Sequence, residues 1–86
     1  MSEAPNRELP PATFSSFTAS LAASAMSAMG EGPGEETNLP MARHTIDLLG
    51  LLREKTDGNL TEEEQKLMDT LLYECRMRFV ERSKTD

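Results

Sequence analysis

The 86-residue sequence lacks several features by which compartment and function are often recognised. It has a single cysteine, Cys75, so no intrachain disulfide can form and nothing indicates an oxidising compartment. No stretch approaches the roughly 20 apolar residues that a membrane-spanning helix needs. Residues 1–8 also lack the basic and apolar regions of a signal peptide. We therefore expect a cytoplasmic protein without a membrane-inserted segment.

An excess of positive charge is also missing, because the formal net charge is -6. Affinity for nucleic acid comes from clustered lysine and arginine side chains, so nucleic acid is not an expected partner. A local cluster of basic residues near the C-terminus is an exception. It could form a phosphate-binding patch, but the favoured interpretation is that its cations complement the negative end of a helix dipole. The residues concerned are Arg76, Arg78, Arg82 and Lys84. The expected partners are proteins.

Signatures of catalysis and cofactor binding are missing as well. The sequence has no glycine-rich phosphate loop and no paired carboxylates in an apolar surround. His44 and Asp47 are spaced to share a metal ion on a helix, but zinc needs two more ligands and none is near in sequence. Cys75 lies in an apolar repeat, where a free cysteine usually acts as a small hydrophobic residue. We therefore predict no enzyme, no cofactor and no metal site, with a metal or thiol enzyme as the least favoured alternative.

Helical periodicity and capping residues, by contrast, are present along most of the chain, and they predict an all-α fold of three helices. Thr13 as an N-cap and Gly30 as a stop predict a first helix over about 14–29. Its large apolar residues repeat on one face, while most of its other side chains are small and contribute little burial energy. The residues that share this face are Phe14, Phe17, Leu21, Ala25 and Ala28.

The strongest local signal is the short turn between Lys55 and Glu64. Lys55 places a cation at the negative end of a helix dipole, and Gly58 can adopt the left-handed backbone that ends a helix. The spacing of Thr61 and Glu64 is that of a capping box, which begins the next helix. The turn therefore predicts an antiparallel helical hairpin.

The second and third helices, which form this hairpin, are expected over 40–56 and 62–82. Asn38 is the candidate N-cap of the second helix, and Pro40 suits its first turn. Gly50 lies in its middle, where either a close contact with another helix or a tolerated defect would explain it. The second helix has a wide apolar stripe made of Met41, Ala42, Thr45, Ile46, Leu48, Leu49 and Leu52. The third helix has an inward stripe made of Leu67, Met68, Leu71, Leu72, Cys75 and Phe79.

Three further segments complete the organisation around a single helical domain over 13–82. Residues 1–12 combine prolines with little apolar surface, so we expect a disordered N-terminal arm. The acidic, glycine-rich segment 30–38 is expected to be a flexible linker, which leaves the docking position of the first helix open. Residues 83–86 are expected to form a tail.

The C-terminal half of the third helix is apolar over more of its circumference than one neighbouring helix can cover. Tyr73, Met77 and Val80 repeat at four and three residues but are rotated away from the inward stripe. Large exposed apolar side chains in a row are uncommon on a monomer, so we predict a contact surface there. With anchors on the first helix, the predicted protein-interaction residues are Phe14, Phe17, Leu21, Tyr73, Met77 and Val80.

Four segments together carry a family resemblance that spans about residues 13–80. They are Phe14 through Ala22, Ile46 through Leu49, Lys55 through Thr61 and Leu72 through Arg78. In these segments the chain resembles a family of short bacterial proteins known as domain of unknown function 1844, which has no established active site. Cys75 stands where a leucine would be expected in this family, which fits a packing position better than a reactive one.

Within this family the chain is similar to a myxobacterial polarity protein associated with a Ras-like small GTPase and a response-regulator scaffold that carries a receiver domain. The resemblance implies a non-enzymatic adaptor in bacterial cell polarity and motility that favours the GTP-bound state of the GTPase. The residues themselves leave an alternative open, a self-associating helical module that is completed by formation of a homodimer.

Overall fold

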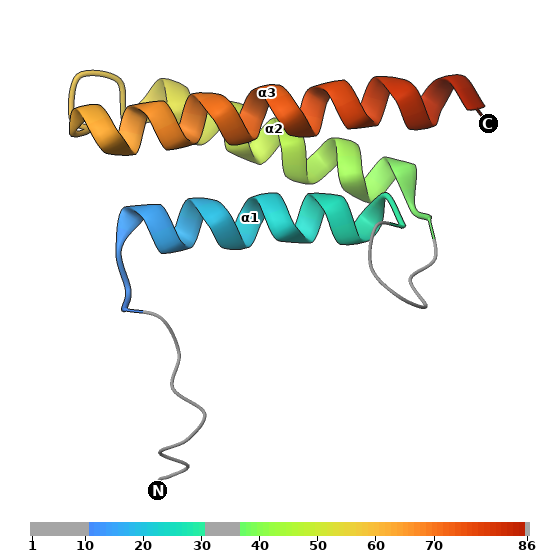
Figure 1. Cartoon of the computed structure of the whole chain (residues 1–86), viewed down its shortest axis with the longest axis horizontal. Helices are drawn as coiled ribbons and strands as arrows, with labels where there is room; N and C mark the ends of the chain where they lie inside the picture. Colours follow the sequence, from blue (N-terminus) through green and yellow to red (C-terminus); the bar gives the residue numbers. More distant parts are fainter. Residues whose placement is uncertain (1–10, 31–36, 86) are drawn as a thin grey trace, which may run out of the picture.

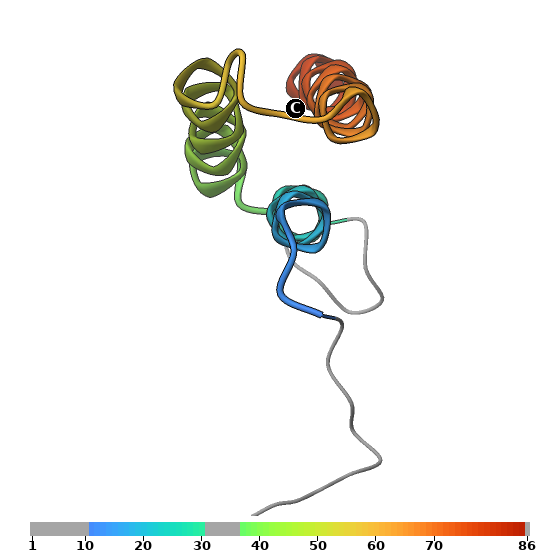
Figure 2. The same ribbon diagram turned by 90° about the vertical axis from the view of Figure 1, so that its left-hand side faces the viewer.

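Three helices make up the fold in the computed structural model, which describes residues 11–30 and 37–85. They are α1 (Phe14–Ala28), α2 (Leu39–Lys55) and α3 (Glu62–Thr85). α1 and α3 run in the same direction and α2 runs antiparallel to both (Figure 1). Seen end-on, the helices stand at the corners of a triangle, and each packs against the other two (Figure 2). The predicted all-α fold and hairpin are confirmed, whereas the expectations for the arm and for most of the linker concern residues outside the described ranges.

Each end of α1 is fixed by local hydrogen bonds. At the N-terminus the Thr13 hydroxyl accepts from the Ser16 amide at 3.0 Å, and the Ser16 hydroxyl accepts from the Thr13 amide at 3.1 Å, which makes a capping box. At the C-terminus Gly30 has φ +81°. This backbone conformation favours glycine, and a Cβ added to Gly30 would lie 2.8 Å from the Thr37 hydroxyl oxygen, so the Thr37 side chain would also have to move. Arg82 of α3 donates to the Gly30 carbonyl at 3.5 Å, which places a cation at the negative end of α1.

The start of α2 is bonded directly to the end of α1. The Asn38 amide donates to the Ala28 carbonyl at 2.6 Å, and the Asn38 side-chain oxygen accepts from the Met41 amide at 3.1 Å. Asn38 is thus the N-cap that the sequence predicts, and Pro40 lies in the first turn. Although the linker composition leaves the position of α1 open, the structure places it against both other helices.

The turn between α2 and α3 has the predicted capping geometry. The Thr61 amide donates to a Glu64 carboxylate oxygen at 2.9 Å, and the Glu64 amide donates to the Thr61 hydroxyl at 3.1 Å. Gly58 has φ +86°. Arg53 links the elements, since its guanidinium donates to Asp69 of α3 at 2.7 Å and to Asp57 of the turn at 3.1 Å. These two carboxylates also raise the pKa of Arg53.

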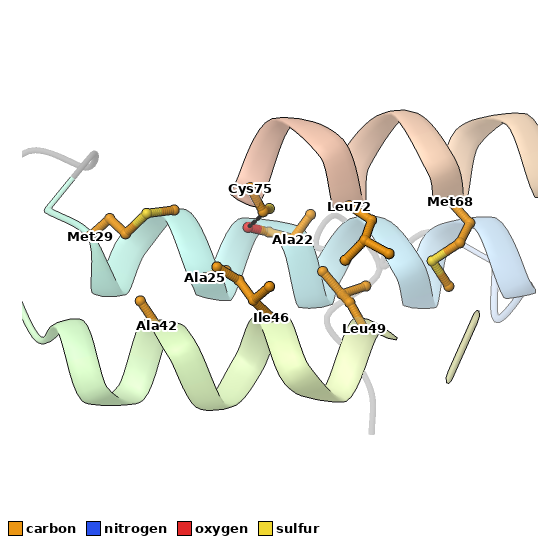
Figure 3. Packing of buried hydrophobic residues seen from close by; sticks show 9 residues of the cluster. All are labelled: Ala22, Ala25, Met29, Ala42, Ile46, Leu49, Met68, Leu72 and Cys75. Atoms are coloured by element: carbon orange, nitrogen blue, oxygen red, sulfur yellow. Dashed lines mark hydrogen bonds between the residues drawn. The ribbon is translucent and has the colours of Figure 1, made fainter. Parts of the chain in front are cut away.

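The core is a small cluster to which all three helices contribute (Figure 3). Its buried apolar residues are Ala22, Ala25, Met29, Ala42, Ile46, Leu49, Met68, Leu72 and Cys75. Alanine is frequent in this cluster, so the helices can approach closely but each contact buries little apolar area. The helices are therefore held in place by their caps, by the turns and by side-chain hydrogen bonds between elements, as well as by this modest apolar core.

The buried face of α1 departs from the predicted one at Phe17, whereas Phe14, Leu21 and Ala28 pack against the core. The sequence pattern places Phe17 on the same face as Phe14 and Leu21, but Phe17 is 51% exposed. The most buried positions are Thr18, Ala22, Ala25 and the capping residue Met29, of which Ala25 belongs to the predicted face. The small residues of α1 face its neighbours because they allow close packing against two helices at once.

The stripes of α2 and α3 are confirmed in their central positions and wrong at two edge positions. Met41 is 51% exposed and Leu48 is 39% exposed, although the apolar pattern of α2 includes both. Gly50 does meet a neighbour, but the neighbour is a side chain: a Cβ there would lie 3.2 Å from an Arg76 nitrogen. The close contact at Gly50 is therefore made by a guanidinium group and not by a helix backbone.

Candidate interaction surfaces

The residues considered for catalysis or metal binding do not assemble into a site. His44 and Asp47 are exposed on α2, and within the described ranges no group of three or more His, Cys, Asp or Glu side chains could hold a metal ion. Cys75 is fully buried, and its thiol lies 3.9 Å from the Ala22 carbonyl oxygen to which it donates (Figure 3). Burial raises the pKa of this thiol, and Glu74 adds to the effect. The geometry matches a packing cysteine, since a reactive one needs exposure and a lowered pKa.

The predicted contact residues of α3 form an exposed row, which we call the α3 outer face. It consists of Tyr73, Met77 and Val80, whose exposed fractions are 64%, 45% and 50%. Their spacing of four and three residues places them in one line along the helix. On the opposite side of α3, Met68, Leu72 and Cys75 are buried in the core. Tyr73 and Met77 therefore point away from the core, whereas Val80 lies at the edge of α3 nearest to α2.

The predicted contact residues of α1 are separate from this row. Phe14 and Leu21 are partly buried and pack against the core, whereas Phe17 is half exposed. Phe17 lies seven residues before Ser24, so the two share a line on the helix. Ser24 lines a shallow hollow between α1 and α2. Phe17 thus lies on the α2 side of α1, and the six predicted residues do not form one surface.

A second exposed apolar surface lies along α1 and α2, and the sequence reasoning did not identify it. Met41 lines the same hollow as Ser24, and Leu48 follows Met41 by seven residues on the same line of α2. Together with Phe17 these residues define the α1–α2 surface. A signal was present, because the apolar stripe of α2 is wider than the contact that one small-residue helix can cover.

A hollow with a mostly apolar lining lies between α2 and α3, and we call it the hairpin groove. Its volume is about 330 Å³, and its lining residues are Arg43, Ile46, Asp47, Arg76, Phe79 and Val80. Val80 belongs to both the groove and the α3 outer face, so these two features are continuous. Arg43 forms an ion pair with Asp47 at 3.8 Å. Both side chains are highly exposed, so this pair contributes little to stability.

Comparison with known proteins places this architecture in a family. The profile of the family described as "Domain of unknown function (DUF1844)" matches residues 11–81. The chain belongs to this family. A search of curated proteins and a search of solved structures each gave no significant match.

The DUF1844 match confirms the resemblance that the sequence segments carry. It begins just before the capping box of α1 and reaches Glu81 of α3. The α3 outer face, the α1–α2 surface and the hairpin groove therefore all lie within the DUF1844 domain. The described residues contain no helix that is both long and apolar enough to cross a bilayer.

Proposed function

We propose that this DUF1844 protein is a non-enzymatic cytoplasmic adaptor that binds a protein partner through the α3 outer face. The exposed row of Tyr73, Met77 and Val80 is the observation that carries the proposal. Full burial of a large apolar side chain contributes about 1.5–3 kcal/mol, so these half-exposed residues retain a substantial part of that gain for a partner. Tyrosine is also among the residues that dominate binding energy at interfaces.

The spacing of the α3 outer face indicates the form of the partner. Positions that repeat at four and three residues make the seam of a coiled coil, in which a second helix packs along the first. A helix of the partner laid along α3 would cover all three side chains at once. This mode of recognition requires no rearrangement of the buried cluster on the other side of α3.

The resemblance to the polarity adaptor suggests a Ras-like small GTPase and a receiver-domain protein as partners, in bacterial cell polarity and motility. An adaptor that binds the GTP form more tightly than the GDP form shifts the population of the GTPase by that difference in affinity. The absence of a charged catalytic residue from the α3 outer face is compatible with this role, because binding alone produces the shift.

Calorimetry with the GTPase loaded with GDP or with a non-hydrolysable GTP analogue tests the proposal. The GTP form should bind more tightly, and a double Tyr73→Ala and Met77→Ala variant should lose at least about tenfold in affinity, or about 1.4 kcal/mol. Leu48→Ala is the matched control, since Leu48 is exposed on the other side of the molecule, and it should bind as the wild type does. Equal affinity for both nucleotide states, or no binding to either, would contradict the proposal.

Self-association is the second candidate, and the presence of two exposed apolar surfaces on so small a domain favours it. A homodimer through the α3 outer face would cover the same residues and complete a larger helical bundle. Light scattering over a concentration series distinguishes the two candidates. A molar mass that stays monomeric at high micromolar concentration removes the dimer, whereas a dimer that the double variant abolishes would support it.

A further inference from the structure

Arg76 stands apart from the other arginines near the end of α3. Arg82 donates to the Gly30 carbonyl, and Arg78 also has an interaction partner. The side chain of Arg76 is exposed, and within residues 11–30 and 37–85 it has neither a hydrogen bond nor an ion pair. Its guanidinium lies over Gly50, where the missing Cβ leaves room for it at the surface of α2. An unpaired guanidinium held at this position can form two parallel hydrogen bonds with a carboxylate.

The floor of the hairpin groove beside Arg76 is apolar. Ile46 is buried, Phe79 is partly buried against the core, and Val80 is half exposed. The volume of about 330 Å³ is at the low end of the range for small-molecule pockets, which is about 300–1,000 Å³. The groove is open along two antiparallel helices, so its shape suits the large side chain of a bound helix better than an enclosed ligand.

Charge places the acidic group of an occupant at the Arg76 end of the groove. Arg43, the cation at the other end, already faces the carboxylate of Asp47, so its charge is partly neutralised. The chain as a whole carries a net charge of -6, so an acidic partner is attracted only where a local cation is unpaired. These observations define one apolar position and one acidic position about a helical turn apart.

We propose that the hairpin groove binds an acidic amphipathic helix of the partner. A large apolar side chain of that helix packs on Ile46, Phe79 and Val80, and a carboxylate three or four residues away pairs with Arg76. The bound helix lies along α2 and α3 and adds a fourth helix to the bundle. This inference rests on the proposed function, because it specifies the chemistry of the partner at a groove continuous with the α3 outer face.

A display library of 16-residue helical peptides with randomised positions, selected on the full-length chain, tests this inference. The enriched sequences should share a large apolar residue with Asp or Glu three or four positions away. A synthesised peptide of this type should bind the Arg76→Glu variant at least tenfold more weakly than the wild type in fluorescence anisotropy. Replacing its acidic residue with lysine should recover binding to Arg76→Glu, and Lys66→Glu, the same charge change elsewhere on α3, should leave the affinity within twofold.

Three results would overturn the inference, provided that circular dichroism shows the variants to be folded. They are no enrichment, enrichment without acidic residues, and equal binding of the selected peptides to the wild type and to Arg76→Glu. Self-association that Arg76→Glu abolishes would also overturn it, since a second copy of the chain would then be the occupant.

The two proposals fail in different ways. Suppose that the GTPase binds the wild type but not the Tyr73→Ala and Met77→Ala double variant, and that no acidic peptide is selected. The groove inference is then wrong and the adaptor function stands. If acidic peptides bind through Arg76 but the GTPase does not bind, the groove inference stands and the proposed GTPase partner is wrong.

Discussion

Thr18 is a polar residue within the packed face of α1. Its side chain is fully buried, and its hydroxyl has no hydrogen-bond partner in the part of the chain that the structure describes. Thr45 on α2 is also buried, but its hydroxyl donates to the Met41 carbonyl at 3.0 Å. These two threonines provide a direct comparison of an unsatisfied and a satisfied buried hydroxyl in the same small core.

We expect Thr18→Val to raise the free energy of unfolding by about 1 kcal/mol, because an unsatisfied buried hydroxyl costs about 1–3 kcal/mol and valine has nearly the same shape. Thr45→Val is the control and should give no such gain, since it removes a hydroxyl that is hydrogen-bonded. Urea denaturation of both variants measures the difference. A Thr18→Val protein less stable than the wild type would show that the hydroxyl is satisfied in solution.

The buried thiol of Cys75 predicts a pH dependence of stability. Because burial raises the pKa of Cys75, the folded state keeps its proton to a higher pH than the unfolded state does. The contribution is therefore complete below the ordinary pKa of a thiol and is lost as pH rises through the raised value, with a slope of at most about 1.4 kcal/mol per pH unit. Urea denaturation of the wild type and of Cys75→Ala from about pH 7 to about pH 10 isolates this contribution from the other titrating groups. Parallel pH profiles would contradict it.

At the scale of single elements, Gly58 in the turn between α2 and α3 and Gly50 within α2 have different structural roles. Gly58 has φ +86° and no atom within 4 Å of an added Cβ, so only the backbone conformation opposes a side chain. Gly50 is helical, and an added Cβ there would meet the flexible end of Arg76 at 3.2 Å. Substitution by alanine should therefore have opposite effects on the free energy of unfolding at the two positions.

We expect Gly58→Ala to lower the free energy of unfolding by about 1–2 kcal/mol, the cost of a left-handed backbone at a residue with a Cβ. Gly50→Ala should raise it by about 0.5–1 kcal/mol, because alanine is the better helix former and the arginine side chain can move aside. Thermal denaturation followed by circular dichroism measures both. A loss of stability in Gly50→Ala would show that the position of Arg76 over α2 contributes to the fold.

The helix ends that carry a cap or a glycine stop could be predicted from the sequence because each depends on residues within one turn, whereas α3 continues to Thr85, beyond the predicted end at 82. The caps at Thr13, Asn38 and Thr61 and the stop at Gly30 need only a side chain and a neighbouring amide or a backbone conformation. The α3 outer face could be predicted for a related reason, since a single helix carried more apolar surface than its neighbours could bury. What the α3 outer face binds depends on a partner, and that information is not local.

At the scale of the whole molecule, the buried face of α1 could be predicted from periodicity only in part. Phe14, Leu21 and Ala25 lie toward the core as the pattern predicts. Phe17 is exposed instead, and the close approach of two neighbouring helices buries Thr18. The hairpin groove was missed for the same reason, because it combines residues of two helices that only packing brings together. The docking of α1 is therefore a property of the assembled bundle.

Enlarging a small residue in this interface tests the docking of α1. Ala25→Leu should lower the free energy of unfolding by about 1–3 kcal/mol, because Ala25 is fully buried and the close-packed helices must separate to admit the larger side chain. Ala23→Leu, two residues earlier on the exposed side of α1, should change it little. Urea denaturation compares the two variants. Equal stability of both would mean that α1 is held loosely enough to shift.

The hydrogen bond from the Asn38 amide to the Ala28 carbonyl has a consequence for how the chain can be engineered. It joins Ala28 and Asn38 on either side of the segment 31–36, so this contact between α1 and α2 is made outside that segment. The entropy of closing a flexible loop grows slowly, by about 0.6 kcal/mol for each doubling of its length. The segment 31–36 is thus a suitable position at which to insert an epitope or a fluorescent reporter.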